Sequence, residues 1–178
     1  MILLTVGTQL PFDRLVRLMD EIAPSLADPV IAQIGRGSYL PRNMTWHRVI
    51  EPVEFERYVA DARFIVSHAG IGSLLTAERH SKPIILFPRT CYLGEHRNEH
   101  QMATVTMISG RPGLAVANDE TQLRHAVLNP PPARHPSPAS PAASKSATPS
   151  ARFSIQRAGV RRCPRPQRPL RPLTSLPA

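Results

Sequence analysis

The residues best suited to chemistry form one short run, Ser67-His68-Ala69-Gly70-Ile71-Gly72-Ser73, between an apolar segment and a helical pattern. Gly70 and Gly72 let the backbone approach a ligand closely, because they carry no side chain. Free N–H groups at the start of the helix that follows attract anions. His68 and Ser73 add a ring N–H and a hydroxyl. The run therefore predicts a diphosphate site, with close packing of strand on helix as the alternative reason for the glycines.

Further polar residues follow this run. Glu78 lies five residues after Ser73, little more than one helical turn further on. Its carboxylate can accept two hydrogen bonds from a ribose diol, although a solvated helix residue explains the same position. After the next apolar segment, residues 88–101 form a polar stretch that ends in Asn98-Glu99-His100-Gln101, where sugar hydroxyls could be recognised.

The elements that must hold these residues alternate between strand and helix patterns. Short apolar runs predict strands, and apolar residues at helical spacing predict the helices between them. This alternation indicates an α/β fold with a Rossmann-like parallel sheet and helices on both faces. Such sheets bind ligands beyond the carboxyl ends of their strands, where the glycine-rich run falls. The predicted strands are residues 2–6, 30–34, 45–50, 63–67, 83–87 and, at an edge, 114–116; the predicted helices are residues 11–23, 54–61, 73–80, 98–109 and 119–128.

Charge and proline content divide the chain in two. Residues 1–129 carry 13 Lys/Arg and 13 Asp/Glu, whereas residues 130–178 carry 9 basic residues, no acidic residue and 12 of the 20 prolines. The second part has too few large apolar side chains to offset the entropy of ordering. We therefore expect one folded domain over residues 1–129 and a disordered Pro/Ser/Arg-rich tail over residues 130–178. A functional tail and a shifted reading frame are both open explanations of the change.

Composition also bears on the compartment and the partners. Cys91 and Cys163 are far apart, so neither a disulfide framework nor a cysteine metal site is indicated, and a reducing cytosol is expected. Residues 1–6 are apolar but lack a basic segment before them, so they predict a strand and not a signal peptide. No segment has the roughly 20 apolar residues of a membrane span. The tail holds one aromatic residue, Phe153, so stacking on bases, and with it nucleic-acid binding, is not expected.

The order of the motifs resembles a known family. Residues 66–73 (VSHAGIGS), Glu78, residues 82–88 (KPIILFP) and residues 98–101 (NEHQ) look like the C-terminal, donor-binding domain of family 28 glycosyltransferases. The opening VGTQLPFD of residues 6–13 resembles a narrower group, the small donor-binding subunits of split transferases. This group includes the cytosolic subunit of the dolichol-linked N-acetylglucosamine transferase and bacterial exopolysaccharide subunits that transfer glucuronic acid or similar sugars. The resemblance covers about residues 1–128.

The resemblance implies a single domain of the GT-B C-terminal type that belongs to a hexosyltransferase with a UDP-sugar donor. It also implies roles for the individual residues of the motifs. His68, Gly72 and Ser73 would contact the diphosphate beside Gly70, Glu78 would hold the ribose, Asn98 and Gln101 would contact the donor sugar, and Gly7 and Thr8 would face the same crevice from the first strand.

The reaction implied by the resemblance is inverting and independent of metal or other cofactors. Fixed donors then stabilise the departing diphosphate, with His68 as one candidate. The general base and the acceptor platform of complete two-domain relatives belong to the other domain. We therefore expect this chain to act with a membrane-associated, acceptor-binding subunit on a lipid-linked acceptor, in polysaccharide or glycan biosynthesis. Such a chain would be cytoplasmic and peripheral at the cytoplasmic face of the membrane.

Two other classes of function stay open. His96-Arg97-Asn98-Glu99-His100 matches H-x-x-E-H, an inverted zinc-peptidase motif in which His96 and His100 bind the metal beside Glu99. The only downstream carboxylates for a third ligand, Asp119 and Glu120, fall on a separate predicted helix. The other class is a non-catalytic protein that binds a partner through the basic tail.

Overall fold

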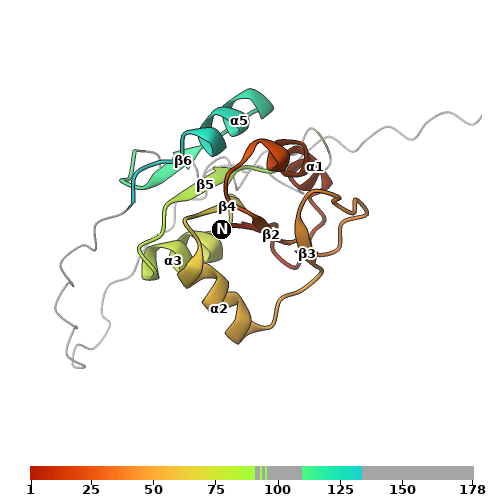
Figure 1. The fold of residues 1–178 in the computed structure, drawn as a ribbon, viewed down its shortest axis with the longest axis horizontal. Coiled ribbons are helices and arrows are strands. Elements are labelled where there is room, and N and C mark those ends of the chain that lie inside the picture. Colours follow the sequence, from red (N-terminus) through yellow and green to blue (C-terminus); the bar gives the residue numbers. More distant parts are fainter. Residues whose placement is uncertain (91–92, 94, 96–109, 134–178) are drawn as a thin grey trace, which may run out of the picture.

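A computed structural model describes residues 1–90, 93, 95 and 110–133 of the chain. Parallel strands and helices alternate along it, as the sequence patterns predict (Figure 1). The strands are β1 (Ile2–Thr5), β2 (Val30–Gln33), β3 (Thr45–His47), β4 (Phe64–His68), β5 (Ile84–Phe87) and β6 (Leu114–Val116). The helices are α1 (Asp13–Ile22), the short 3-10 helix η1 (Ala23–Ser25), α2 (Pro52–Asp61), α3 (Ile71–Arg79) and α5 (Glu120–Leu128).

The six strands form one parallel sheet in the order β3-β2-β1-β4-β5-β6. The chain first winds outward from β1 to β3 and then crosses back to place β4 on the other side of β1. Leu4 of β1 is level with Ala32 of β2 and with Val66 of β4. The winding direction therefore changes between β1 and β4, and a doubly wound sheet opens a crevice at such a point.

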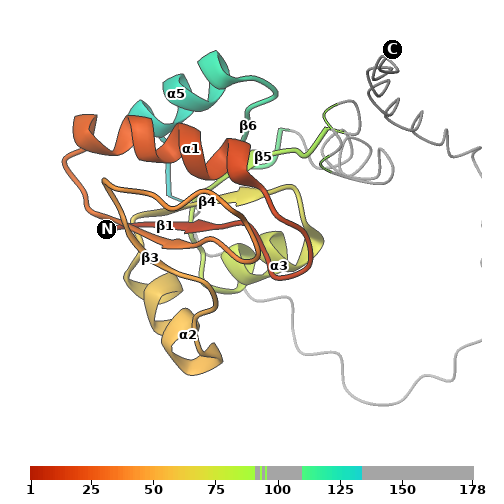
Figure 2. The same cartoon turned by 90° about the vertical axis from the view of Figure 1, so that its right-hand side faces the viewer.

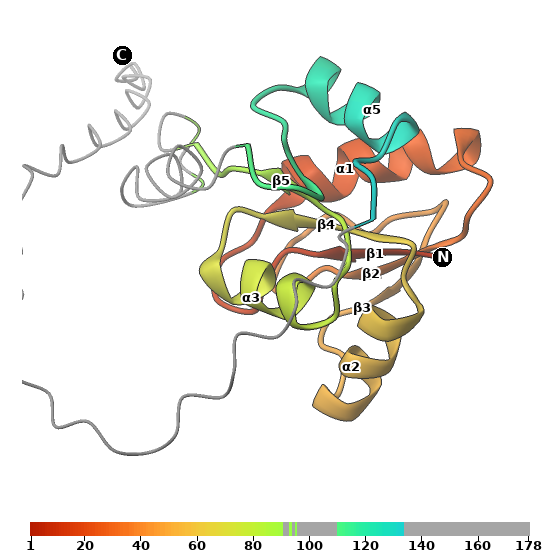
Figure 3. The ribbon, with the colours of Figure 1, turned by 90° about the vertical axis from the view of Figure 1, so that its left-hand side faces the viewer.

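Two apolar layers enclose the sheet. Figures 2 and 3 show α1 and α5 over one face and α2 and α3 over the other. Because side chains alternate along a strand, Leu4 packs with α1 and α5, whereas Leu3 packs with α2 and α3. Burial on both faces explains why β1, β4 and β5 are continuous apolar runs and do not alternate with polar residues.

The predicted elements are confirmed within the described residues, with shifts at their ends. The connection between β4 and α3 is shorter than predicted. Helix α3 begins at Ile71 and not at residue 73, so Gly72 lies in its first helical turn. Helix α2 begins two residues before the predicted start, with Pro52 in the first turn, where proline loses no hydrogen bond. Strand β3 ends at His47, before the predicted residue 50. The N–H of Ile50 is instead bonded to the side chain of Gln33.

A buried carboxylate on α1 fixes the long loop between β2 and β3. Asp20 is 2% exposed and accepts hydrogen bonds from Tyr39 Oη at 2.7 Å, from Arg42 N at 3.0 Å and from Asn43 N at 2.7 Å. Burial raises the pKa of Asp20, but these hydrogen bonds outweigh it, and the net pKa lies below the ordinary value. The charged form of Asp20 therefore stabilises the fold.

The remaining predictions about organisation fall on residues 91, 92, 94, 96–109 and 134–178, outside the described part of the chain. They include the helix over residues 98–109 and the tail. Helix α5 ends at Leu128, and the run of prolines starts at Pro130. The domain boundary after residue 129 stays a prediction. None of the helices in the described ranges has the length and apolarity needed to cross a bilayer.

Candidate functional site

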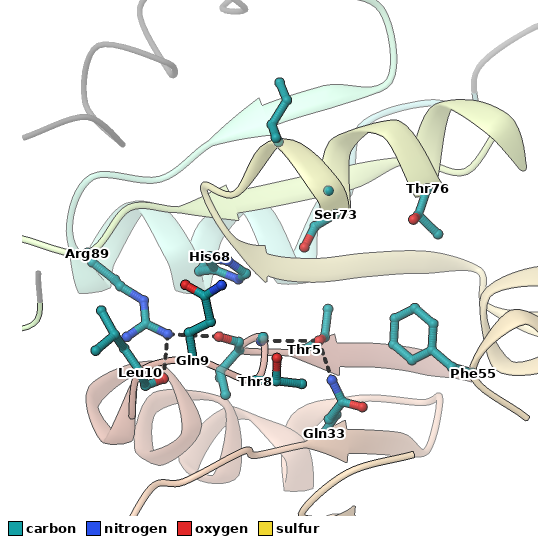
Figure 4. A pocket seen from close by; sticks show the side chains of 14 residues that line it. Thr5, Thr8, Gln9, Leu10, Gln33, Phe55, His68, Ser73, Thr76 and Arg89 are labelled. Carbon is teal, nitrogen blue, oxygen red and sulfur yellow. Dashed lines mark hydrogen bonds between the residues drawn. The ribbon is translucent and has the colours of Figure 1, made fainter. Parts of the chain in front are cut away.

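A cleft of about 490 Å³ lies at the carboxyl ends of β1 and β4, where the sheet changes its winding direction (Figure 4). One wall is the first turn of α3, and the opposite wall is the loop between β1 and α1. The lining residues are Thr5, Val6, Gly7, Thr8, Gln9, Leu10, Gln33, Phe55, His68, Ile71, Gly72, Ser73, Thr76 and Arg89.

The α3 wall presents a helix N-terminus to the cleft. Gly70 is the N-cap residue and provides no side-chain cap, so the first N–H groups of α3 depend on other acceptors. A Cβ on Gly72 would meet no atom within 4 Å, so the backbone there borders open space. Figure 4 shows the side chains of Ser73 and Thr76 directed from α3 into the cleft. This wall combines the positive end of a helix dipole with two hydroxyl groups, which suits an anion.

His68, the last residue of β4, stands between two glycines. A Cβ on Gly70 would lie 2.4 Å from His68 Nε2, and a Cβ on Gly7 would lie 2.8 Å from His68 Cε1. Neither position can carry a side chain unless the imidazole moves. Gly7 also has a φ of +73°, which disfavours other residues. His68 Nδ1 lies 3.4 Å from Ser67 Oγ. The two glycines therefore create the slot that holds this ring at the cleft.

The base of the β1 wall is a small polar network. Thr5 Oγ1 accepts hydrogen bonds from Gly7 N at 3.4 Å and from Gln33 Nε2 at 3.3 Å. Gln33 is 6% exposed, and its Oε1 accepts from Ile50 N at 3.0 Å. Gln33 thus joins β1 to the segment that precedes α2, and it brings an amide to the cleft.

A buried arginine completes the floor. Arg89 is 3% exposed, and its Nη2 donates to the carbonyl oxygens of Val6 and Leu10 at 2.8 Å each, while Nη1 donates to that of Pro11. Burial lowers the pKa of Arg89, and the negative charge of Glu95 opposes this. An arginine stays protonated even so. The cleft therefore has a fixed positive charge beside its β1 wall.

The cleft continues along α2 and α3. An adjoining hollow of about 280 Å³ shares Gln33, Phe55 and Thr76 with it. The hollow adds Ile50, which precedes α2, and Pro52 and Glu56 of α2. Its lining residues are Gln33, Ile50, Pro52, Phe55, Glu56 and Thr76.

The structure brings most of the predicted site residues together. Gly7, Thr8, His68, Gly72 and Ser73 all line the cleft, and the N-cap residue Gly70 borders it through His68. They come from two segments about 60 residues apart in sequence, and the pairing of β1 with β4 joins them. Their predicted contacts with a diphosphate remain predictions.

Other predicted residues lie elsewhere. Glu78 does not line the cleft, and its Oε1 accepts from Arg111 Nη1 at 3.1 Å. The prediction that Glu78 holds the ribose stays a prediction, and its side chain does not line this cleft. Asn98 and Gln101, predicted to contact the sugar, lie outside the described residues, as does the H-x-x-E-H motif. Within the described ranges, no three His, Cys, Asp or Glu side chains gather as metal ligands would.

Sequence reasoning missed several cleft residues. Thr76 lies three residues after Ser73, so helical spacing alone places it on the same face, and this signal was available. Arg89 gives no such signal, because its hydrogen-bond partners lie 78 to 83 residues earlier in the chain. The same holds for Thr5, Gln33 and Phe55, which only the folded sheet brings to the site.

Comparisons with known proteins agree with this architecture. The family model described as glycosyltransferase family 28 C-terminal domain matches residues 1–150. Among solved structures, the glycotransferase of kitacinnamycin is similar with a TM-score of 0.55 and 20% identity, over 72% of this chain and 34% of the other. Spinosyn forosaminyltransferase SpnP is similar with a TM-score of 0.51 and 16% identity, over 71% of this chain and 34% of the other.

The two solved structures show likeness of fold, since both identities are low. This chain spans about a third of the length of each of them. A comparison with curated proteins found no match.

Proposed function

The chain belongs to the glycosyltransferase family 28 C-terminal domain family, and on this premise we propose that its cleft binds the UDP portion of a nucleotide-sugar donor. One observation carries the proposal. The N-terminus of α3, the ring of His68 and the charge of Arg89 converge on a single cleft of about 490 Å³. That volume is within the usual range for small-molecule sites, and the converging groups are donors or cations.

In this proposal the diphosphate lies between the two walls. The N–H groups of Gly72 and Ser73 and the Ser73 hydroxyl donate to phosphate oxygens from the α3 wall. Thr8 faces them from the β1 wall. The Gly72 position supports this arrangement, because the space next to its Cα is open. A backbone without a side chain lets phosphate oxygens come within hydrogen-bond distance of the amides.

The nucleoside then points along the cleft toward the adjoining hollow. Thr76 and Gln33 provide hydrogen-bonding groups for the ribose, and Phe55 provides an apolar surface for the base. A Gln33 side chain already held by Thr5 and Ile50 loses little further freedom on binding. We assign Thr76 in place of Glu78 to the ribose, because Thr76 lines both hollows.

The chemistry that such a site supports is glycosyl transfer. The bond between the anomeric carbon and the β-phosphate oxygen breaks, and a bond to an acceptor oxygen forms. Negative charge collects on the departing UDP, and donors already fixed at the helix N-terminus stabilise it without reorganisation. His68 adds a ring N–H to these donors. A site of this kind stabilises the leaving group without metal, and attack from the opposite face inverts the anomeric centre.

Transfer also needs an acceptor site and a base for the acceptor proton. We propose that a membrane-associated partner subunit supplies both, that the acceptor is lipid-linked, and that the complex works at the cytoplasmic face of the membrane in polysaccharide or glycan biosynthesis. The resemblance of residues 6–13 to the small donor-binding subunits of split transferases supports this. The chain alone is then expected to bind donor but not to transfer sugar.

Calorimetric titration of the full chain tests the donor site. UDP is expected to bind at one site with the same affinity in EDTA, and UDP-N-acetylglucosamine, UDP-glucuronic acid and UDP-glucose are compared to rank the sugars. Gly72→Asp places a carboxylate in the cleft, where it repels phosphate, and it should weaken UDP binding by tenfold or more, about 1.4 kcal/mol. The same carboxylate favours the helix N-terminus, so the fold should remain.

His125→Ala is the matched control, because His125 lines a separate groove beside α5. It should leave the UDP affinity unchanged. Absence of saturable UDP binding, or equal binding by wild type and Gly72→Asp, would contradict the proposal.

A further inference from the structure

The side chain of Arg89 spans the carboxyl edge of the sheet. Arg89 lies two residues after the end of β5, yet its guanidinium bonds to the loop that follows β1, two strands away in the order β1-β4-β5. It thereby passes the end of β4, where His68 stands. Figure 4 shows the guanidinium beside Leu10, and it donates to the carbonyl oxygens of both Val6 and Leu10. Arg89 therefore connects the end of β5 to the loop after β1, and β4 lies between these two strands in the sheet.

A reciprocal pair of arginine and phenylalanine contacts holds this connection. The guanidinium of Arg89 lies 4.7 Å from the centroid of the Phe12 ring, just before α1. The guanidinium of Arg14, in the first turn of α1, lies 4.3 Å from that of Phe87, the last residue of β5. The two rings stack on each other at 5.9 Å. Each contact of this kind is favourable when it is shielded from water.

An ion pair closes the same connection on the outside. Glu95 accepts from Arg14 Nε at 2.7 Å and from Arg14 Nη2 at 2.8 Å, and it also accepts from Thr90 N at 2.9 Å. Both charged side chains are mostly buried, at 19% and 12% exposed. A two-point contact of this kind fixes orientation as well as distance. The start of α1 is thus tied to the segment that carries Arg89.

We infer that Arg89 is a positioning residue for the diphosphate: it holds the loop of residues 6–11 as the second wall of the anion site and places a positive charge behind it. The inference rests on the proposed function and extends it to a residue outside the motifs. Three carbonyl oxygens that would otherwise direct negative charge near the cleft are bound to a cation. Phosphate then meets a wall with a favourable potential.

A positioning role and a purely structural role predict different effects on ligand affinity. A residue that only supports the fold affects every ligand of the cleft equally. Figure 4 shows Arg89 and Phe55 at opposite ends of the cleft, with Thr8 and Ser73 between them, and only Phe55 also lines the adjoining hollow. Its loss should therefore reduce the affinity for the diphosphate and spare the nucleoside.

The test compares UDP, UMP and uridine on the full chain. Arg89→Met keeps the length of the side chain and removes its charge and its donors. We expect it to weaken UDP binding by about tenfold or more, since a fixed positive charge beside the diphosphate is lost, to weaken UMP less, and to change uridine binding less than about twofold. Uridine is followed by NMR-detected titration, which reaches millimolar affinities.

Arg89→Lys keeps the charge but cannot span three carbonyl oxygens. Arg89→Lys therefore provides the test if Arg89→Met fails to fold. Its ratio of UDP affinity to uridine affinity should lie below that of wild type and above that of a folded Arg89→Met. Arg48→Met is the matched control. Arg48 also donates to backbone carbonyls, those of Gly35 and Gly37, on the neighbouring loop, but it does not line the cleft. Its ratio should equal that of wild type.

The outcomes distinguish a failure of the role inferred for Arg89 from a failure of the proposed UDP site. If wild type binds UDP but the ratio of UDP to uridine affinity is the same in wild type, Arg89→Lys and any folded Arg89→Met, the inference is wrong and the donor site stands. A fall of the ratio in Arg48→Met equal to that in the Arg89 variants would also overturn it. If wild type does not bind UDP, the proposed function fails and the inference fails with it.

Discussion

Replacement of Gly70 by alanine would bring a methyl group against the imidazole of His68. The added Cβ would lie 2.4 Å from His68 Nε2, 3.0 Å from Cδ2 and 3.1 Å from Cε1. Because comfortable contacts lie near 3.5 Å, the ring must move by about 1 Å. It has little room toward Gly7, whose own Cβ would lie 2.8 Å from Cε1. The ring is therefore expected to swing into the cleft.

The energetic cost has two parts. Overpacking against the ring costs about 1–3 kcal/mol. Gly70 is also the N-cap of α3, where alanine is poorer than glycine, and this adds up to about 1 kcal/mol. The backbone itself adds no strain, because φ at Gly70 is −94°. Displacement of His68 should in addition lower the affinity for UDP by about tenfold, or about 1.4 kcal/mol.

A double-mutant cycle with His68→Ala separates these terms. Urea unfolding measures the free energy of unfolding of wild type, Gly70→Ala, His68→Ala and the double variant, and calorimetry measures UDP affinity for each. Without the ring, Gly70→Ala should cost only the N-cap part, and it should weaken UDP binding no further. If Gly70→Ala costs as much stability in the His68→Ala background as in wild type, the two glycines do not act through the imidazole, and the reasoning is refuted.

Two further predictions concern the loop between β2 and β3 and the part of the cleft lined by Thr76. Asp20→Asn removes the charge that accepts three hydrogen bonds from the loop of residues 39–43 and should lower the free energy of unfolding by about 1–3 kcal/mol at pH 7. Because the folded pKa of Asp20 is lowered, its contribution is fully present above the unfolded value near pH 4 and is lost as pH falls through the folded pKa. The difference in free energy of unfolding between wild type and Asp20→Asn, measured by urea unfolding, should therefore narrow below about pH 4. A difference that does not change with pH would contradict this. Thr76→Val should weaken UDP binding several-fold, whereas Glu78→Gln should change it less than about twofold, since only Thr76 lines the cleft; the reverse ranking in calorimetry would assign the ribose to Glu78.

The fold was predictable because local patterns decide it. Strands β1, β4 and β5 are buried on both faces, so their sequences are continuous apolar runs that are easy to recognise. The ends of elements were harder to predict. The start of α3 at Ile71 depends on Gly70 taking an extended conformation, and the end of β3 depends on Gln33 capturing the N–H of Ile50. Neither the conformation of Gly70 nor the hydrogen bond of Gln33 leaves a periodic pattern in the sequence.

The site was predictable only in part. His68, Gly70 and Gly72 lie within five consecutive residues, so their spacing alone predicts an anion site. Gly7 and Arg89 belong to the same cleft through pairings between distant strands, which single-sequence reasoning does not establish. Arg89 illustrates the limit, because a buried arginine is recognisable only from the carbonyl oxygens that surround it.

Amide shift mapping of the ¹⁵N-labelled full chain with UDP tests the central claim most directly. The account predicts that the largest perturbations fall on the amides of Gly72 and Ser73 on one wall and of Thr8 on the other, and that they saturate together at one affinity. Perturbations confined to the separate groove beside α5, around Gln122 and His125, or none in either wall of the cleft, would contradict it.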